Sequence, residues 1–351
     1  MAFPRIRLWH GLLLLPAVAL GVFGFRQQSL ASKPCVIGPG AKCFAADLSG
    51  QDLRRADLRG ADLRQVRLVG ASLEEANLSG ARLDGSVLIG ADLERANLRG
   101  ASLRKVFCRA CDLEEAQLWG ADLSEADVDG SDLESANLRF AKLRRARLRG
   151  NDLESADLQF ADAAGADFTG ANLGRARLSD ANLNRARLQA VDLASARLDQ
   201  ATLVRADLRR ARLGIRVVAS GEGGGNLVIP PDSPCFPLAG CRPEDASLKA
   251  TSDDTGVGAL LVNTDLTGAD LTGADLNGVV MVGGSLRQAR LKEANTNGAR
   301  WLGVGFQRTL CPDGSARSAP CPGFQVPQGG TEQAQALARV AWLRGLPWPW
   351  D

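Results

Sequence analysis

The chain has 351 residues, of which 45% are hydrophobic and only 5% aromatic, so a core built on aromatic side chains is not expected. Its 42 Lys and Arg nearly balance 40 Asp and Glu, and a formal net charge of +2 argues against both a nucleic-acid binder and a strongly acidic nucleic-acid mimic. There is no Tyr, and the single histidine is His10. Catalytic triads and metal sites that use histidine are therefore excluded from the rest of the chain.

The first 31 residues have the features of a secretory signal. Arg5 and Arg7 precede an apolar run over residues 8–25, and small residues lie before an expected cleavage site after Ala31. The run also reaches the lower length limit of an uncleaved membrane anchor, which is the alternative interpretation. Both predict an exported body, in the periplasm, in the thylakoid lumen or on the outer face of the cytoplasmic membrane. Membrane contact is expected only through residues 8–25, if they are not cleaved.

Eight cysteines form four near-neighbour pairs, as an oxidising compartment permits. The candidate disulfide residues are Cys35, Cys43, Cys235, Cys241, Cys311 and Cys321, with their connectivity left open. Cys108 and Cys111 have the spacing of two zinc ligands, but no second pair and no histidine accompanies them. Both fall on inward positions of the repeat described next, where free cysteine behaves as a small hydrophobe. Free, buried thiols are therefore expected there, and no metal site is predicted.

A five-residue repeat occupies the middle of the chain. Leucine recurs at every fifth position from Leu48 to Leu213, and alanine stands two residues before most of these leucines. The exceptions at the leucine position are Cys108, Val128, Ala163 and Phe168. A period of five fits neither a helix nor a flat strand, because both would scatter the leucines over several faces. Only a regularly turning coil keeps Leu and Ala inside.

The pattern of Ala, Asp or Asn, Leu and two variable residues resembles the pentapeptide-repeat proteins. The resemblance implies an all-β fold, a right-handed quadrilateral parallel β-helix with four pentapeptides in each coil. Central Leu and preceding Ala would fill a narrow interior, and stacking of the coils would bury it. Residues 20 apart in sequence would then lie directly above one another.

The repeat lapses after Gly214 and resumes in a new phase at Leu261, with Thr296, Trp301 and Phe306 at the later leucine positions. A C-terminal helix is predicted over Thr331–Arg344, and we expect it to cap the solenoid together with the tail Pro347–Trp350. The predicted segments are a signal or anchor over 1–31, a Cys-containing cap over 32–45, a repeat solenoid of about 8.5 coils over 46–215, a Gly- and Pro-rich insertion with a Cys pair over 216–258, a second repeat segment of about 2.5 coils over 259–308, and a C-terminal cap of Cys loop, helix and Trp-rich tail over 309–351.

Stacking at a period of 20 predicts an uneven charge distribution. One face gathers nine carboxylates, which we call the carboxylate wall: Glu74, Asp92, Glu94, Asp112, Glu114, Asp132, Glu134, Asp152 and Glu154. The opposite face has a surplus of Arg and Lys, and a neighbouring column alternates as Arg55, Glu75, Arg95 and Glu115. Asp before Leu is the usual residue of the repeat, so only the Glu column is unexpected. A merely solvated face is the plainer interpretation of the wall. The alternative is an interaction face, whose crowded carboxyls would have raised pKa values.

Three classes of function fit these features to different degrees. The first is a noncatalytic exported scaffold that presents long charged faces to a protein partner, with weak self-association through its own basic face. The second, suggested by the resemblance, is a DNA-mimicking inhibitor or modulator of a type II topoisomerase. The third, an enzyme with paired carboxylates, is weakest because the repeat accounts for every Asp and Glu pair. The scaffold is preferred, with no catalytic residues and no cofactor; Trp119, Phe140 and Phe160 are interpreted as a local packing patch.

Overall fold

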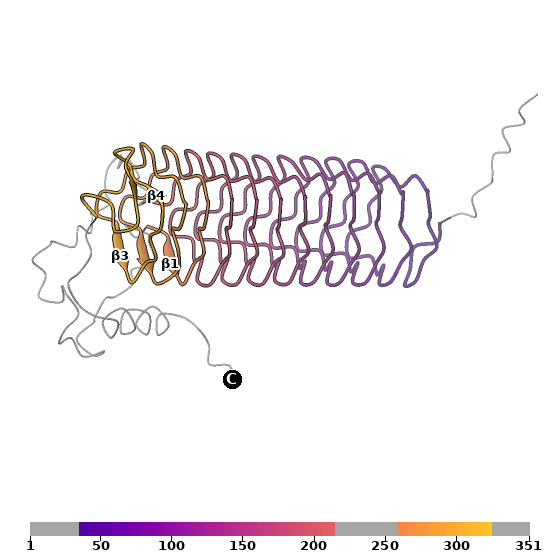
Figure 1. Ribbon diagram of the computed structural model, residues 1–351. Helices are drawn as coiled ribbons and strands as arrows, with labels where there is room; N and C mark the ends of the chain where they lie inside the picture. The colour runs from indigo at the N-terminus through magenta and orange to yellow at the C-terminus, as the bar shows by residue number, and fades with distance from the viewer. Residues whose placement is uncertain (1–34, 215–257, 325–351) are drawn as a thin grey trace, which may run out of the picture. The chain divides into compact units, whose positions relative to one another are not determined.

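The computed structural model describes residues 35–214 and 258–324, and these wind into stacked four-sided coils (Figure 1). The residue before each inward Leu forms a parallel bridge with the residue 20 positions later, as Asn77 does with Asn97. The Leu58 N–H donates to the Asn77 carbonyl at 2.7 Å, and the Asn77 N–H donates to the Ala56 carbonyl at 2.9 Å. The expected four-sided parallel β-helix is therefore confirmed.

Leu and Ala fill the interior of the coils. Leu58, Leu63 and Ala61 are fully buried, and the same holds along the stack for most leucines and alanines of the repeat. One coil substitutes two of its leucines at once, with Ala163 and Phe168 both buried. Since a coil is too thin to bury its own side chains, contacts between coils supply the hydrophobic stabilisation.

Two local features turn the chain at every corner. The last residue of each pentapeptide, from Gly40 to Arg210, has positive φ, with values of 66° and 58° at these two ends. At many corners an Asp or Asn precedes the Leu position. Its side chain accepts the backbone N–H of the residue that follows the Leu position. Thr169, for example, donates to Asp167 Oδ1 from its backbone N–H at 3.1 Å and from its hydroxyl at 2.6 Å. The repeat thus uses Asp and Asn because their short side chains cap the turn.

The two repeat segments form one continuous stack. Arg197 bridges Leu260 and Arg212 bridges Asp275, so the coil passes from the first segment to the second in full alignment. The Ala259 N–H donates to the Leu213 carbonyl at 2.7 Å, which is the bond that closes an ordinary corner, as from Ala61 to Leu58. The five-residue spacing therefore changes phase because residues 215–257 are inserted between the two residues of a single turn, Gly214 and Gly258.

Glycine is required on both sides of this junction. A Cβ on Gly214 would lie 2.9 Å from the Asn277 carbonyl oxygen, and one on Gly258 would lie 3.0 Å from backbone atoms of Gly278. Both contacts are with backbone atoms, which cannot rotate away as a side chain would. Glycine therefore permits the close stacking of the junction on the next coil.

The regular strands lie in the last coils. Strands β1 (Leu260–Val262), β2 (Val280–Val282) and β3 (Arg300–Leu302) form a parallel sheet in the order β1-β2-β3. Strands β4 (Thr309–Leu310) and β5 (Ala316–Arg317) form an antiparallel pair. Figure 1 shows them at the C-terminal end of the stack.

Aromatic rings close this end of the stack. Trp301 stacks on Phe324 with ring centroids 4.6 Å apart, and Phe306 packs against both. Large rings at the leucine positions of the last described coil therefore pack on each other and on Phe324. Phe324 was not expected there.

Three disulfides lie in the described residues: Cys35–Cys43, Cys108–Cys111 and Cys311–Cys321. The first and third join near neighbours, in the way that the spacing suggested. The interpretation of Cys108 and Cys111 as free thiols is wrong, although both do point inward and are 2% exposed. Adjacent inward positions of one corner bring the two sulfurs together, which residue type alone did not reveal.

Several expectations concern residues outside the described ranges. These are the signal or anchor over 1–31, the insertion with Cys235 and Cys241, the helix Thr331–Arg344 and the Trp-rich tail. Within 35–214 and 258–324, no helix has the length and apolar character that crossing a membrane requires.

Candidate functional site

The nine residues of the carboxylate wall lie on one face, as the period of 20 predicted. Asp92, Asp112, Asp132 and Asp152 are linked by successive parallel bridges, and each wall Glu follows two residues after one of these Asp or after Ser72. Stacked strands are about 4.8 Å apart, so the wall from Glu74 to Glu154 is about 19 Å long. Its structural position is therefore clear, while its role as an interaction face is a proposal.

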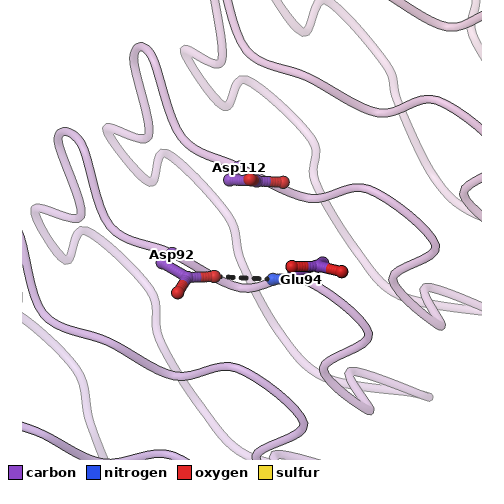
Figure 2. Close-up of side chains that lie close together, drawn as sticks. All are labelled: Asp92, Glu94 and Asp112. Carbon is purple, nitrogen blue, oxygen red and sulfur yellow. Dashed lines mark hydrogen bonds between the residues drawn. The ribbon is translucent and has the colours of Figure 1, made fainter.

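Asp92, Glu94 and Asp112 approach one another most closely within the wall (Figure 2). One carboxylate oxygen of each lies within 4.8 Å of the other two, and all three side chains are half-buried. Asp92 Oδ1 accepts the Glu94 backbone N–H at 3.1 Å, and Asp112 Oδ1 accepts that of Glu114 at 3.1 Å. The Asp carboxylates therefore serve as turn caps, and their clustering follows from the repeat rather than from a metal.

Among the described residues, the ion pairs of the wall lie at Glu94 and at its Glu154 end. Arg95 pairs with Glu94, and Arg175 lies 3.7 Å from Glu154. In the described part of the chain no cation lies within ion-pair distance of Glu114 or Glu134. Burial raises the pKa of Glu134, and the negative charges of Asp152, Glu114, Glu154 and Asp132 raise it further. This is the direction expected for crowded carboxyls.

The column beside the wall behaves differently. Arg55 Nε lies 2.8 Å from a Glu75 carboxylate oxygen, and Arg95 lies 3.9 Å from Glu75 and 3.7 Å from Glu115. The predicted axial alternation of charge is therefore present. The alternation pairs the charges of that column with one another. Among the described residues, it supplies no cation to Glu114 or Glu134 at the centre of the wall.

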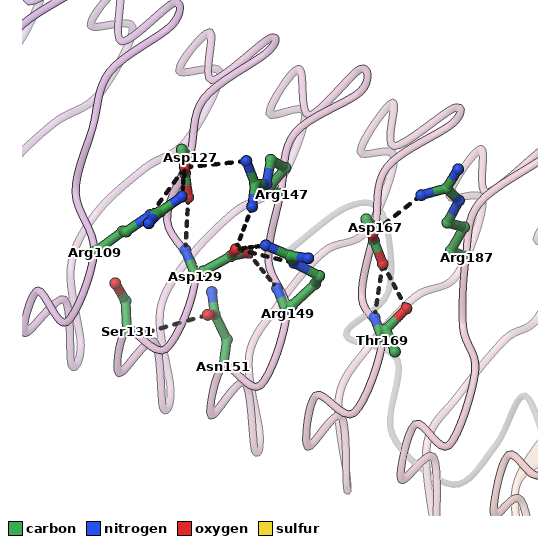
Figure 3. Close-up of polar contacts among 10 residues, drawn as sticks. All are labelled: Arg109, Asp127, Asp129, Ser131, Arg147, Arg149, Asn151, Asp167, Thr169 and Arg187. Atoms are coloured by element: carbon green, nitrogen blue, oxygen red, sulfur yellow. Dashed lines mark hydrogen bonds and ion pairs between the residues drawn. The ribbon is translucent and has the colours of Figure 1, made fainter.

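A second charged face carries an ion ladder that the sequence analysis did not single out (Figure 3). Its column reads Asp127, Arg147, Asp167 and Arg187 in successive coils. Arg147 lies 3.4 Å from Asp127, and Arg187 lies 3.5 Å from Asp167. The alternation of Asp and Arg at intervals of 20 residues was the signal that could have revealed it.

Among the ion pairs of the described residues, Asp127 at the end of the ladder has the least exposed side chain. The Asp127 side chain is 7% exposed and receives Arg109 Nη2 at 2.5 Å. Asp129, two residues after Asp127, accepts hydrogen bonds from the guanidinium groups of Arg147 and Arg149 (Figure 3). The repeat can thus neutralise a stacked column where its sequence alternates. In the two columns of the carboxylate wall, acidic and basic residues do not alternate.

Three exposed rings form the aromatic corner, defined as Trp119, Phe140 and Phe160 with Arg139. Phe140 and Phe160 stack with centroids 4.9 Å apart, and Trp119 meets Phe140 edge-on at 5.8 Å. The guanidinium of Arg139 lies 5.8 Å from the centroids of both Phe rings. The rings do contact one another, as the packing interpretation held, but all three remain substantially exposed.

Comparison with known proteins places the chain in a family. A family model described as pentapeptide repeats matches residues 41–80, 67–104, 111–150, 152–189, 186–214 and 257–283, which together exceed half of the chain. No curated protein matches it.

The chain also matches solved structures, among them the following three. HetL of the cyanobacterium Nostoc sp. strain PCC 7120, a protein involved in heterocyst differentiation regulation, is 28% identical, with a TM-score of 0.29 over 79% of this chain and 91% of HetL. Full-length QnrB1, a plasmid-mediated fluoroquinolone resistance protein, is 18% identical, with a TM-score of 0.29 over 76% of this chain and 93% of QnrB1. A thylakoid lumen protein of Arabidopsis thaliana is 26% identical, with a TM-score of 0.18 over 36% of this chain and 70% of that protein.

The 20-residue bridges, the inward Leu and Ala and the Asp-capped corners lie in the residues that this family model matches. The fold is accordingly a right-handed β-helix, and the chain belongs to the pentapeptide-repeat family.

Proposed function

We propose that this protein is a noncatalytic, exported interaction scaffold whose carboxylate wall binds a basic surface of a protein partner. One observation carries the proposal: the centre of the wall is left without cations, although the same fold pairs charges in the adjoining column and in the ion ladder. Like charges stacked across strands oppose one another. A cationic partner would remove that repulsion.

The charge density of the wall supports a macromolecular partner over a small ion. Two carboxylates per coil, at about 4.8 Å between coils, give about one negative charge per 2.4 Å. Duplex DNA carries about one per 1.7 Å. A flat wall offers few converging ligands to a hard cation, but it suits a surface with several Lys or Arg side chains.

Export is supported by the N-terminal residues and by the disulfides. Cys35–Cys43 and Cys311–Cys321 flank the described solenoid, and disulfides persist in oxidising compartments. The noncatalytic part of the proposal follows from composition, because the chain has no Tyr and no histidine beyond His10.

A pair of charge-matched variants tests the wall. Glu114→Gln with Glu134→Gln removes two uncompensated charges. Glu125→Gln with Glu293→Gln removes two charges that already have partners, since Glu125 lies 3.6 Å from Lys105 and Glu293 lies 3.4 Å from Lys292. The probe is a fluorescent peptide of alternating lysine and serine, followed by anisotropy.

We expect the wall variant to bind this peptide severalfold more weakly than the parent at low salt, because each exposed charge contributes up to about 1 kcal/mol there. The difference should shrink at high salt as the charges are screened. The control variant should bind like the parent. If both variants bind alike, the wall is only a solvated face.

The acidic wall also motivates one alternative, modulation of a type II topoisomerase by mimicry of DNA charge. The expected export and the basic face opposite the wall oppose it. A supercoiling assay with purified gyrase separates the two functions. Inhibition that disappears with Glu114→Gln and Glu134→Gln would favour mimicry, and unchanged supercoiling would favour the scaffold.

A further inference from the structure

We infer that the aromatic corner is the apolar anchor of the partner-binding surface, and that the surface takes an extended basic segment of a protein. Lysine or arginine side chains of that segment lie over the carboxylate wall, and its apolar side chains pack on Trp119, Phe140 and Phe160. This inference rests on the proposed function of the wall. It adds a site for the apolar side chains of the partner, which the carboxylates of the wall cannot bind.

The rings of the aromatic corner contribute nothing to the core beneath them. Leu118, Leu138 and Leu158 fill that part of the interior and are fully buried. The rings are instead 48%, 44% and 43% exposed for Trp119, Phe140 and Phe160. A contiguous exposed aromatic cluster is characteristic of an interaction site on a soluble protein.

The two Phe side chains stand where the preceding coils have glycine. Phe140 and Phe160 have φ of 58° and 60°, in the left-handed region that disfavours bulky side chains. Gly120 and Gly100 occupy the same column one and two coils before Phe140, with φ of 66° and 63°. The fold therefore accepts glycine at this corner, so Phe is not required for the turn.

The aromatic corner is organised by contacts among its rings and Arg139. Phe140 and Phe160 are nearly parallel, at an interplanar angle of 6°, and cover each other's faces. Arg139 is held by Gln159 at 2.7 Å and lies 3.7 Å from Asp157. Its position over both rings shows that a guanidinium fits against them.

Wall and aromatic corner lie side by side on the same coils. Glu114 and Trp119 bound one face of a single coil, and the strand between them spans about 10 Å. That face presents the amides of Gln117 and Asn137, which bridge each other in successive coils. A partner segment that covers these amides reaches carboxylates on one edge and rings on the other. Charge complementarity with the wall thus fixes a basic occupant for the aromatic corner.

Another exposed apolar pair supplies a matched control. Ile89 and Phe107 are 43% and 47% exposed, but they lie on the face of the ion ladder. Their charged neighbours in that face include Arg67 and Arg109, not a row of carboxylates. If apolar contact alone drove binding, Phe107 would serve as well as Phe140.

The experiment compares two peptides of equal length and charge on the purified full chain. One alternates lysine with leucine, and the other alternates lysine with serine. The parent should bind the leucine peptide about tenfold more tightly, since buried aromatic anchors contribute most of the affinity of an interface. Trp119→Ala with Phe140→Ala should lose this gain and keep the binding of the serine peptide. Phe107→Ala should keep both.

Each other outcome has a distinct meaning. If the Trp119→Ala, Phe140→Ala variant keeps the gain for leucine, or if Phe107→Ala loses it equally, the inference is overturned while the wall proposal stands. If the serine peptide binds the parent and the Glu114→Gln, Glu134→Gln variant alike, the proposed function itself fails. A fall in oligomer mass on Trp119→Ala with Phe140→Ala, measured by light scattering, would assign the aromatic corner to a second copy of the chain instead.

Discussion

The Asp and Glu residues of the wall differ in what they do for the fold. Asp132 accepts the Glu134 backbone N–H at 2.9 Å, and Asp152 accepts that of Glu154 at 3.0 Å. These Asp side chains therefore hold the turns in addition to carrying charge. Glu114 and Glu134 have no such bond among the described residues. Charge can be removed at the Glu positions without weakening a corner, which is why they are the informative positions to change.

At this scale we predict that Glu134→Gln stabilises the protein at neutral pH. The folded-state pKa of Glu134 is raised, so above that pKa the ionised side chain disfavours the folded state. Gln removes this cost, and the gain should be about 0.3 kcal/mol for an exposed like-charge contact. The gain should vanish at pH values below the ordinary Glu pKa, where the parent side chain is neutral in both states. Urea denaturation at pH 7 and at acidic pH measures it. A variant that is less stable at pH 7 would contradict the prediction.

A single coil shows how the narrow interior constrains the element. Ala163 and Phe168 hold adjacent leucine positions of one coil, and they are 1% and 0% exposed. One position loses volume where the next gains it. We interpret the pair as mutually compensating, because protein interiors are close-packed and overfilling costs as much as emptying.

This interpretation predicts strong coupling between the two sites. Ala163→Leu alone should destabilise the protein by about 1–3 kcal/mol through overpacking. Phe168→Leu alone should cost about 1 kcal/mol through a void. The double variant restores Leu at both positions and should be about as stable as the parent. The effects of the two substitutions should therefore be far from additive. Thermal or denaturant unfolding of the four proteins measures the cycle. Additive effects would show that the two side chains do not share space.

At the scale of the whole molecule, the described solenoid behaves as one stack that a long insertion does not disturb. Residues 197 to 212 bridge residues 260 to 275 in the same way as neighbouring coils of the first segment do. Gly214 and Gly258 occupy the two turn positions between Leu213 and Ala259, where Arg59 and Gly60 stand in an ordinary corner. The described coils therefore contain everything that the stacking requires.

We predict that deletion of residues 215–257, with Gly214 joined directly to Gly258, leaves the solenoid folded. The far-UV circular dichroism of the coils should persist, and stability should be unchanged or higher, by up to about 3 kcal/mol, because a long loop no longer has to be closed. A deletion of equal length over 213–255 puts Gly256 at the buried position of Leu213, so it loses a core side chain and should melt lower. Equal melting of the two deletion variants would contradict the continuous register.

Much of this was determined by the sequence. The five-residue recurrence of Leu indicated a regularly turning coil with Leu and Ala inside, and the resemblance to the pentapeptide-repeat proteins implied four pentapeptides per coil and the interval of 20. The wall residues followed directly from that interval. The alternating column of Arg55, Glu75, Arg95 and Glu115 followed as well. In a solenoid, position in sequence largely determines position in space, since each coil contacts only its neighbours.

Only the tertiary structure decided what depends on contacts across a corner or a junction. The sulfurs of Cys108 and Cys111 meet because two inward positions of one corner converge, whereas their residue types suggested free thiols. The alignment of Arg197 with Leu260 could not be read from a repeat that resumes out of phase. The partner of each charge likewise depends on how far a side chain reaches between coils. The wall's position was therefore predictable, whereas the lack of a paired cation at Glu114 and Glu134 among the described residues was not.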